Sequence, residues 1–118
     1  MATKQEVEHF LNDFKTKLRS FRIYFLDERG KNSQALLDLE ISPIKRKEII
    51  ERLTVDDYYK GPLEEQMYGM RPMWAFGKLI KGIEVYIKIS MGLPNQDAIC
   101  ISFHKAEHEM TYPFKPER

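Results

Sequence analysis

The sequence predicts an α+β domain in which N-terminal helices pack on a C-terminal antiparallel β-meander, and three observations predict it. The length of 118 residues fits one domain, residues 1–118. Apolar residues recur at helical spacing through about residues 1–53, whereas three β-prone runs fill residues 73–105. Only short turns separate these runs, so the strands must be antiparallel neighbours. Residues 54–72 are expected to form a functional loop, and residues 106–118 an apolar C-terminal tail that docks on the domain.

The N-terminal segment is predicted to be an amphipathic helix. Thr3 and Glu6 have the spacing of a capping box, in which the hydroxyl and the carboxylate each satisfy a free backbone N–H. Residues 21–26 are rich in β-formers and precede a turn signal, so a short strand or an extended exit is expected there. The apolar residues of the helical pattern are Val7, Phe10, Leu11, Phe14, Leu18 and Phe21.

Two further helices are predicted in the N-terminal half. One is expected to start at Asn32 or Ser33, and the other at Ser42, a good N-cap, with Pro43 at its first position. The basic cluster at residues 45–47 is interpreted as a solvated helix face, as most charge runs are. The first of these helices is expected to carry Leu36, Leu37 and Leu39, and the buried stripe of the second is expected to be Ile44, Ile49, Ile50 and Leu53.

The segment 54–72 lacks periodicity and is predicted to be a long loop. Loops of this length are uncommon inside compact domains and tend to be functional or mobile. Three tyrosines and two cations suit it to stacking on bases and to contacting phosphates. Alternatively, its aromatic side chains pin it into the core.

Alternation along the strands predicts which side chains share a face of the sheet. A short loop at residues 81–82 pairs Gly77 with Tyr86 and Ala75 with Lys88. In the last strand Ile99, Ile101 and Phe103 are expected to face the core. For the two apolar faces to coincide, Ile87 must pair with Ile101. This pairing places Tyr86 near Ser102, and it places His104 opposite Glu84. The predicted polar face is a shallow floor of Ala75 and Gly77 walled by Tyr86, Lys88, Ser102 and His104.

This polar face suits phosphodiester chemistry without a metal. RNA cleavage needs a base for the 2′-OH, an acid for the leaving 5′ oxygen and cations for the charge on phosphate. Histidine titrates near neutral pH, so His104 could be the acid or the base. Tyr86 could donate a proton or stack on a base, and Lys88, with Lys60 or Arg71, could hold the phosphate. The alternative is an outer sheet face that is polar and inactive.

Other chemistries find little support in the sequence. The run His104 to His108 matches a zinc pattern, but that pattern needs a helix and here it straddles a strand end. Cys100, the one cysteine, is interpreted as a structural thiol in a reducing cytosol. No glycine-rich phosphate loop is present, so no metal or cofactor is expected.

Composition narrows the classes of protein further. The chain has no apolar run near the roughly 20 residues that span a bilayer, and its start has no apolar h-region, so a cytoplasmic location is expected. The formal net charge is +1, with 19 Lys and Arg against 18 Asp and Glu. Any affinity for nucleic acid must therefore depend on where the charges lie.

Two segments, Leu53 to Lys60 and Val85 to Ile89, resemble the MqsR family of type II toxin–antitoxin toxins, within the RelE-like ribonuclease group. The family's Trp strand and final Ser-Phe strand follow in order, at Trp74 and at residues 101–103. The resemblance implies a metal-independent endoribonuclease of RelE-like, microbial-ribonuclease-like fold that cleaves mRNA. It also implies a cognate antitoxin, of the helix-turn-helix type. The family's functional Lys and Tyr fall on Lys60 and Tyr86.

The chain departs from the family at two positions. Ala75 stands where a polar residue is expected after the strand Trp, which bears on cleavage specificity. His104, followed by Lys105, stands where a basic residue is expected after Ser-Phe, which keeps a group for proton transfer or phosphate binding.

The sequence thus predicts an endoribonuclease that is a monomer or weak dimer when alone. A catalytically silent RNA- or protein-binding module of the same fold is the alternative. The predicted catalytic residues are Lys60, Tyr86 and His104, and the predicted RNA- or phosphate-binding residues are Tyr59, Arg71, Trp74, Lys88, Ser102 and Lys105.

Overall fold

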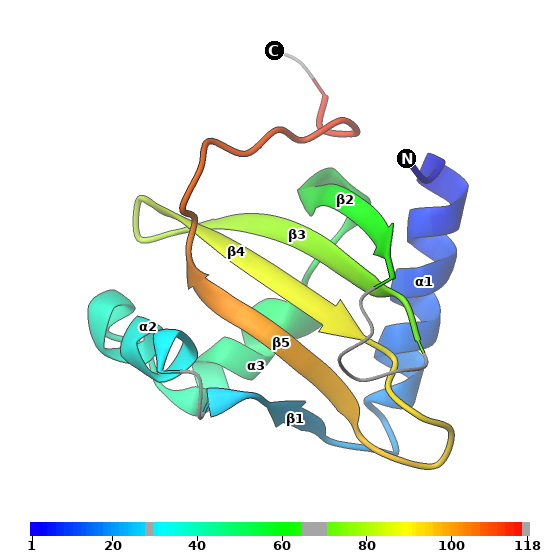
Figure 1. Cartoon of the computed structure of the whole chain (residues 1–118), viewed down its shortest axis with the longest axis horizontal. Helices are drawn as coiled ribbons and strands as arrows, with labels where there is room; N and C mark the ends of the chain where they lie inside the picture. The colour runs from blue at the N-terminus through cyan, green and yellow to red at the C-terminus, as the bar shows by residue number, and fades with distance from the viewer. Residues whose placement is uncertain (28–29, 65–70, 117–118) are drawn as a thin grey trace.

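In the part of the chain that the structure describes, five strands form one mixed sheet in the order β1-β5-β4-β3-β2, and three α-helices pack against it (Figure 1). This computed structural model describes residues 1–27, 30–64 and 71–116. The predicted α+β class, with helices in the N-terminal half and strands in the C-terminal half, is confirmed. The helices are α1 (Lys4–Lys17), α2 (Lys31–Leu39) and α3 (Pro43–Glu51), and the strands are β1 (Ile23–Phe25), β2 (Tyr58–Leu63), β3 (Met73–Ile80), β4 (Ile83–Ser90) and β5 (Ala98–Lys105).

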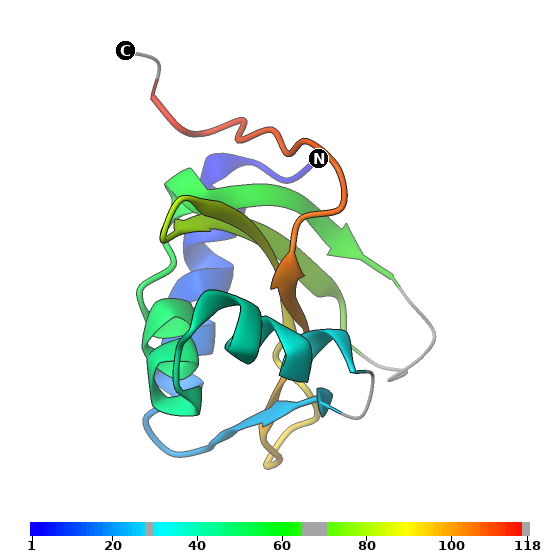
Figure 2. The same ribbon diagram turned by 90° about the vertical axis from the view of Figure 1, so that its left-hand side faces the viewer.

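The sheet is antiparallel except at one edge. β2 to β5 pair antiparallel, whereas β1 runs parallel to β5. Helices α1 and α3 lie on one face of the sheet, and α2 packs against β5 (Figures 1 and 2). The other face of the sheet is called the open face below. No helix within the described ranges is both long enough and apolar enough to cross a membrane.

Helix α1 begins with the predicted capping box. The Glu6 backbone N–H donates to Thr3 Oγ1 over 3.1 Å, and the Thr3 backbone N–H donates to Glu6 Oε1 over 2.8 Å. The helix ends at Lys17, so Phe21 lies beyond it rather than on its apolar stripe. Its buried residues are Val7, Phe10, Leu11 and Phe14.

Helix α3 begins as predicted, because Ser42 Oγ accepts a hydrogen bond from the Lys45 backbone N–H. The start of α2 was predicted one or two residues too late. Gly30 occupies the N-cap with a φ of 80°, and the buried stripe of the helix is Asn32, Ala35 and Leu39. Ile44 was predicted to be buried but is 73% exposed, as is Leu37 of α2.

The basic cluster at residues 45–47 is not a uniformly solvated face. Arg46 is only 3% exposed. Its guanidinium forms two hydrogen bonds with the Asp27 carboxylate, of 2.9 and 3.2 Å, and lies 3.6 Å from the centre of the Phe25 ring. A planar cation can satisfy a carboxylate and an aromatic face together, which ties α3 to the end of β1.

The predicted loop over residues 54–72 contains a strand. A short 3₁₀ helix, η2 (Val55–Asp57), leads into β2, which pairs with β3. Register shifts along β2, together with Gly61 and Pro62, interrupt the alternation by which a strand is found in a sequence. The aromatic side chain of Tyr58 is fully buried, as the alternative interpretation expected. The part of the predicted loop at residues 65–70 lies outside the described residues.

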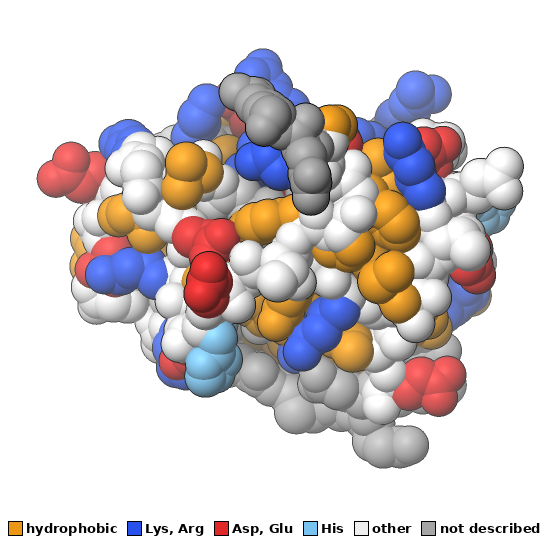
Figure 3. Space-filling model, turned by 90° about the horizontal axis from the view of Figure 1, so that it is seen from above, with side chains coloured by type: hydrophobic (Ala, Val, Ile, Leu, Met, Phe, Trp, Pro, Cys, Tyr) orange, Lys and Arg blue, Asp and Glu red, His pale blue; other side chains and the backbone are white. Residues whose placement is uncertain are grey.

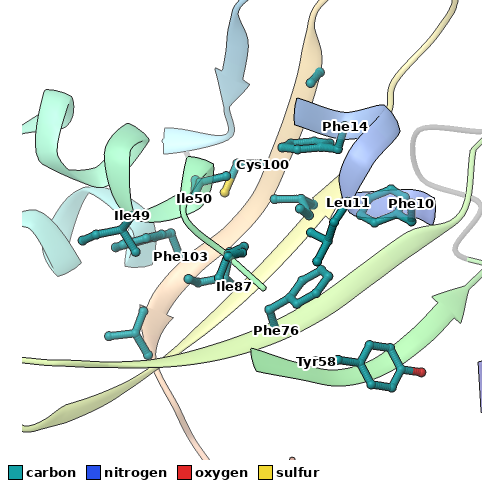
Figure 4. Close-up of a cluster of buried hydrophobic side chains, with 14 of the residues drawn as sticks. Phe10, Leu11, Phe14, Ile49, Ile50, Tyr58, Phe76, Ile87, Cys100 and Phe103 are labelled. Atoms are coloured by element: carbon teal, nitrogen blue, oxygen red, sulfur yellow. The ribbon is translucent and has the colours of Figure 1, made fainter. Parts of the chain in front are cut away.

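The main core fills the space between the helices and the sheet (Figure 4). Phe10 and Phe14 of α1 and Ile50 of α3 meet Phe76 and Phe103 of the sheet there. These side chains are almost completely buried, which provides the apolar area that a domain of this size needs. The core therefore covers the face of the sheet that is opposite the open face.

Candidate active site

The pairing of β3 with β4 is the one that the sequence predicted. Gly77 lies opposite Tyr86, and Ala75 lies opposite Lys88. Side chains two residues apart on a strand point to the same face. Tyr86 and Lys88 therefore share the open face.

The predicted pairing of β4 with β5 is wrong by two residues. His104 lies opposite Tyr86 rather than opposite Glu84. The rings of Tyr86 and His104 are consequently direct neighbours, with centroids 5.7 Å apart. The observed partners are Tyr86 and His104, Ile87 and Phe103, and Lys88 and Ser102.

A β-bulge in β5 accounts for one of these two residues, because the pairing of Ile89 with Cys100, before the bulge, already differs from the predicted one by one residue. Consecutive residues of β4 pair with Ser102 and Cys100, which leaves Ile101 as an extra residue. Cys100 enters the main core, whereas Ile99 and Ile101, which were predicted to face it, lie with a small separate cluster. Phe103 faces the main core as predicted. The bulge thus restores the alternation that puts Ser102 and His104 on the open face.

A pocket of about 510 Å³ lies on the open face. Strands β2, β4 and β5 line it, and the start of α2 and the first residues after β5 complete its wall. The lining side chains that the sequence predicted are Tyr59, Lys60, Tyr86, Lys88, Ser102 and His104. Residues from three strands, far apart in the sequence, therefore meet in one concave site.

The aromatic rings of the pocket form a row. Tyr59 lies edge-on to Tyr86 with centroids 6.3 Å apart, and Tyr86 is next to His104. The ammonium of Lys60 lies 5.2 Å from the centre of the Tyr59 ring. The row offers apolar faces on which a planar ligand can stack, with cations beside them.

The tautomer of His104 follows from its hydrogen bond. Its Nδ1 lies 2.9 Å from the backbone oxygen of Lys105. A carbonyl oxygen can only accept, so Nδ1 must carry the hydrogen. In the neutral ring the lone pair is then on Nε2, which is the atom available to take a proton.

The predicted floor of Ala75 and Gly77 is not open. Ala75 is fully buried, and the tail covers Gly77, where an added Cβ would lie 2.3 Å from the Tyr112 hydroxyl oxygen. Tyr112 donates a 2.8 Å hydrogen bond to Glu84, and its burial and this bond raise the pKa of the phenol. The pocket is therefore displaced from β3 toward β5 and α2.

Three predicted site residues lie outside this pocket. Trp74 points to the helix face of the sheet and stacks on Phe10, with centroids 4.7 Å apart. Arg71 lines a second pocket with Trp74, beside α1. Lys105 Nζ lies 3.8 Å from a carboxylate oxygen of Asp38. Alternation along β3 predicts the direction of Trp74, on the same face as Phe76, and the structure has it so. The positions of Arg71 and Lys105 depend on how the ends of the strands pack against the helices.

The chain matches no protein-family model, no curated protein and no solved structure. The resemblance to the MqsR family stays a prediction. The geometry of the pocket is the observation from which a function can be proposed.

Several lining residues were missed from the sequence. Lys31 and Glu107 form a 2.6 Å ion pair that borders the pocket, beside His108. The hydrogen bond from Lys31 lowers the pKa of the Glu107 carboxyl, and the positive charge of Lys31 lowers it further. Asn32 also lines the pocket. No local pattern links the start of a helix to the end of a strand more than 70 residues later, so only the fold reveals this contact.

The cysteine behaves as the structural thiol that was predicted. Cys100 is completely buried, its thiol donates to the Ser102 backbone oxygen, and burial raises its pKa to about 12. Such a thiol is protonated at neutral pH and is a poor nucleophile. Within the described ranges, no three His, Cys, Asp or Glu side chains are grouped closely enough to hold a metal ion.

Proposed function

We propose that the protein is an endoribonuclease that cleaves mRNA without a metal, as the toxin of a type II toxin–antitoxin pair. The observation that supports this function is the convergence of Lys60, Tyr86, Lys88 and His104 in one pocket. Each has a role in metal-independent cleavage: proton transfer for His104 and Tyr86, and stabilisation of phosphate charge for the lysines.

In the proposed reaction, Nε2 of His104 takes the proton from a ribose 2′-OH. The 2′-oxygen forms a bond to phosphorus, and the bond from phosphorus to the 5′-oxygen breaks. The Tyr86 phenol gives its proton to the departing 5′-oxygen. The products are a 2′,3′-cyclic phosphate and a 5′-hydroxyl. Lys60 and Lys88 stabilise the charge that develops on the non-bridging oxygens.

The charges near the pocket favour an anionic ligand. Among the described residues that line it, three lysines and two histidines face a single carboxylate, Glu107. Elsewhere the signs are mixed: on the face where the tail lies, Lys and Arg side chains are interspersed with Asp, Glu and hydrophobic ones (Figure 3). The proposed RNA contact is therefore local to the pocket, which is compatible with a net charge of +1.

The test is cleavage of a long RNA by purified protein in the presence of EDTA. We expect products with 2′,3′-cyclic phosphate and 5′-hydroxyl ends. His104→Ala should lower the rate by roughly 100-fold or more, since general acid–base groups contribute about 10²–10⁴-fold. Lys60→Ala should also lower it by roughly 100-fold, the scale on which loss of one group that stabilises transition-state charge is felt. Lys105→Ala is the matched control, because this adjacent cation lies outside the pocket, and it should retain the parent rate.

Equal activity of the parent and the His104→Ala and Lys60→Ala variants would contradict the proposed site. RNA binding without any cleavage would favour the alternative, a catalytically silent binding module, which the near-neutral net charge supports. The proposal also implies a cytoplasmic location, where mRNA is found, a monomer or weak dimer when alone, and a protein antitoxin. An adjacent reading frame encoding a helix-turn-helix protein would support that partner.

A further inference from the structure

The bulge in β5 decides which side chains enter the pocket. Ile101 and Ser102 are adjacent in the sequence, yet both line the pocket. A regular strand would place them on opposite faces, and Ser102 and His104 would then share the face of Cys100, inside the main core. Any group that holds the bulge therefore holds His104 on the open face.

Strand β1 does not reach the bulge. Its pairs with β5 end at Phe25 and Cys100, and one further hydrogen bond joins the Leu26 N–H to the Cys100 oxygen. The next backbone groups of β5 on this edge belong to Ile101 and Phe103. Both residues are buried, so these groups need partners within the protein.

The side-chain amide of Asn32 supplies those partners. Its Nδ2 donates to the Ile101 oxygen over 3.0 Å, and its Oδ1 accepts from the Phe103 N–H over 2.9 Å. Nδ2 also donates to the Leu26 oxygen over 3.0 Å. The amide thus bonds the residues on either side of Ser102, as one residue of a neighbouring parallel strand would.

Asn32 is itself fixed in place. It is 1% exposed and lies in the first turn of α2, after the turn at Gly30. Its three hydrogen bonds use two donors and one acceptor on a short side chain. Asp lacks the donors, and an aliphatic residue lacks all three groups. Residue 32 is therefore an asparagine because the site needs both an amide donor group and an amide acceptor.

We propose that Asn32 is a positioning residue of the active site: it holds the β5 bulge, and through it sets the directions of Ser102 and His104. This inference rests on the proposed function for its effect on cleavage. Asn32 itself takes no part in proton transfer. Loss of the Asn32 amide lowers the rate by displacing His104, and a displacement of about 1 Å can cost roughly 100-fold in rate.

The experiment compares Asn32→Ala with Leu39→Ala. Leu39 is an equally buried residue of α2 that packs in the main core, away from the bulge, and its truncation controls for lost stability. Cleavage of a short RNA is measured well below the unfolding temperature of each variant. For Asn32→Ala we expect a roughly 100-fold lower kcat with KM changed little, because the lysines that hold phosphate stay in place. For Leu39→Ala we expect the parent kcat.

A second readout needs no RNA. The ring resonances of His104, followed by NMR, should move in Asn32→Ala and stay in place in Leu39→Ala. If the parent protein cleaves no RNA, the proposed function fails, and the His104 resonances still decide the positioning role. If Asn32→Ala does not fold, Asn32→Asp, which keeps the size and the acceptor but loses both donors, is measured instead. A folded variant with the parent kcat, or equal losses in the Asn32 and Leu39 variants, would overturn the proposal.

Discussion

The guanidinium of Arg46 lies between an aromatic ring and a carboxylate, and it joins two elements that are remote in sequence. The Phe25 ring packs against one side, and the Asp27 carboxylate accepts two hydrogen bonds from its edge. The Arg46 side chain is 4% exposed, whereas that of Asp27 is 42% exposed. The cation of this ion pair is therefore buried, whereas the carboxylate stays in contact with water. The exposure of the carboxylate keeps the desolvation cost of the pair moderate.

Replacing Arg46 tests this role. Arg46→Ala should lower the free energy of unfolding by about 2 kcal/mol, the scale of hydrogen bonds to a charged group. Arg46→Lys should recover only part of this, because an ammonium cannot bind the carboxylate with two parallel N–H groups. Urea denaturation monitored by circular dichroism measures both values.

The neighbouring exposed cation provides the control. Lys45 forms only a surface pair with Glu48, at 3.7 Å. Lys45→Ala should change the free energy of unfolding by about 0.5 kcal/mol or less. Similar losses for the Lys45 and Arg46 variants would show that Arg46 is an ordinary surface cation.

At the scale of elements, the N-terminal cap of α1 makes the folding stability depend on pH, and the direction of this dependence follows from the Glu6 carboxyl. Hydrogen bonds from Thr3 lower the pKa of the Glu6 carboxyl below its ordinary value of 4.5. A lowered folded-state pKa means that the charged form stabilises the folded protein. The stabilisation is therefore present above about pH 4.5 and is lost as the pH falls through the folded-state pKa.

The Glu6→Ala variant should therefore have a lower free energy of unfolding than the parent at pH 7. This difference in free energy should shrink as the pH is lowered below 4.5. Urea midpoints at pH 7, 5 and 3 measure this trend. Glu8→Ala, a change on the same helix outside the capping box, is the control and should show a smaller dependence. A Glu6→Ala difference that is constant with pH would contradict the role of the charge.

Some helices and strands could be predicted from the local sequence pattern, and others could not. The capping box of α1 and the Ser42–Pro43 start of α3 were predicted because their chemistry lies within a few consecutive residues. Strand β2 was missed because Gly61, Pro62 and two register shifts remove its alternation. The pairing of β5 was wrong in part because of its bulge, whose backbone groups bond Asn32, about 70 residues earlier.

At the scale of the whole molecule, the C-terminal tail closes part of the open face. Met110 and Tyr112 lie over Gly77, and Phe114 stacks on Tyr58 with centroids 5.3 Å apart. Figure 2 shows the chain after β5 turning along the sheet toward β2. The tail thus buries apolar surface and also forms one wall of the pocket.

Removing residues 112–118 should lower the free energy of unfolding by about 2 kcal/mol, the value of burying one large apolar side chain. The Tyr112→Phe variant separates the contributions, since it keeps the ring but loses the bond to Glu84, and it should cost about 1 kcal/mol. Urea denaturation measures both. Unchanged stability after truncation would show that the tail does not contribute to the fold.

The sequence alone determined the helices with clear caps, the three antiparallel strands, the pairing of β3 with β4, and the residue types of the candidate site. These depend on contacts between residues that are close along the chain. The tertiary structure decided that β1 joins β5 in parallel, that the tail covers Gly77, and that Arg71 and Lys105 lie outside the pocket. The alternation along the strands had predicted His104 on the open face, but the tertiary structure decided the bulge and the register that make His104 the direct neighbour of Tyr86. An amide from another element satisfies the backbone at the bulge, and no local pattern encodes such a contact.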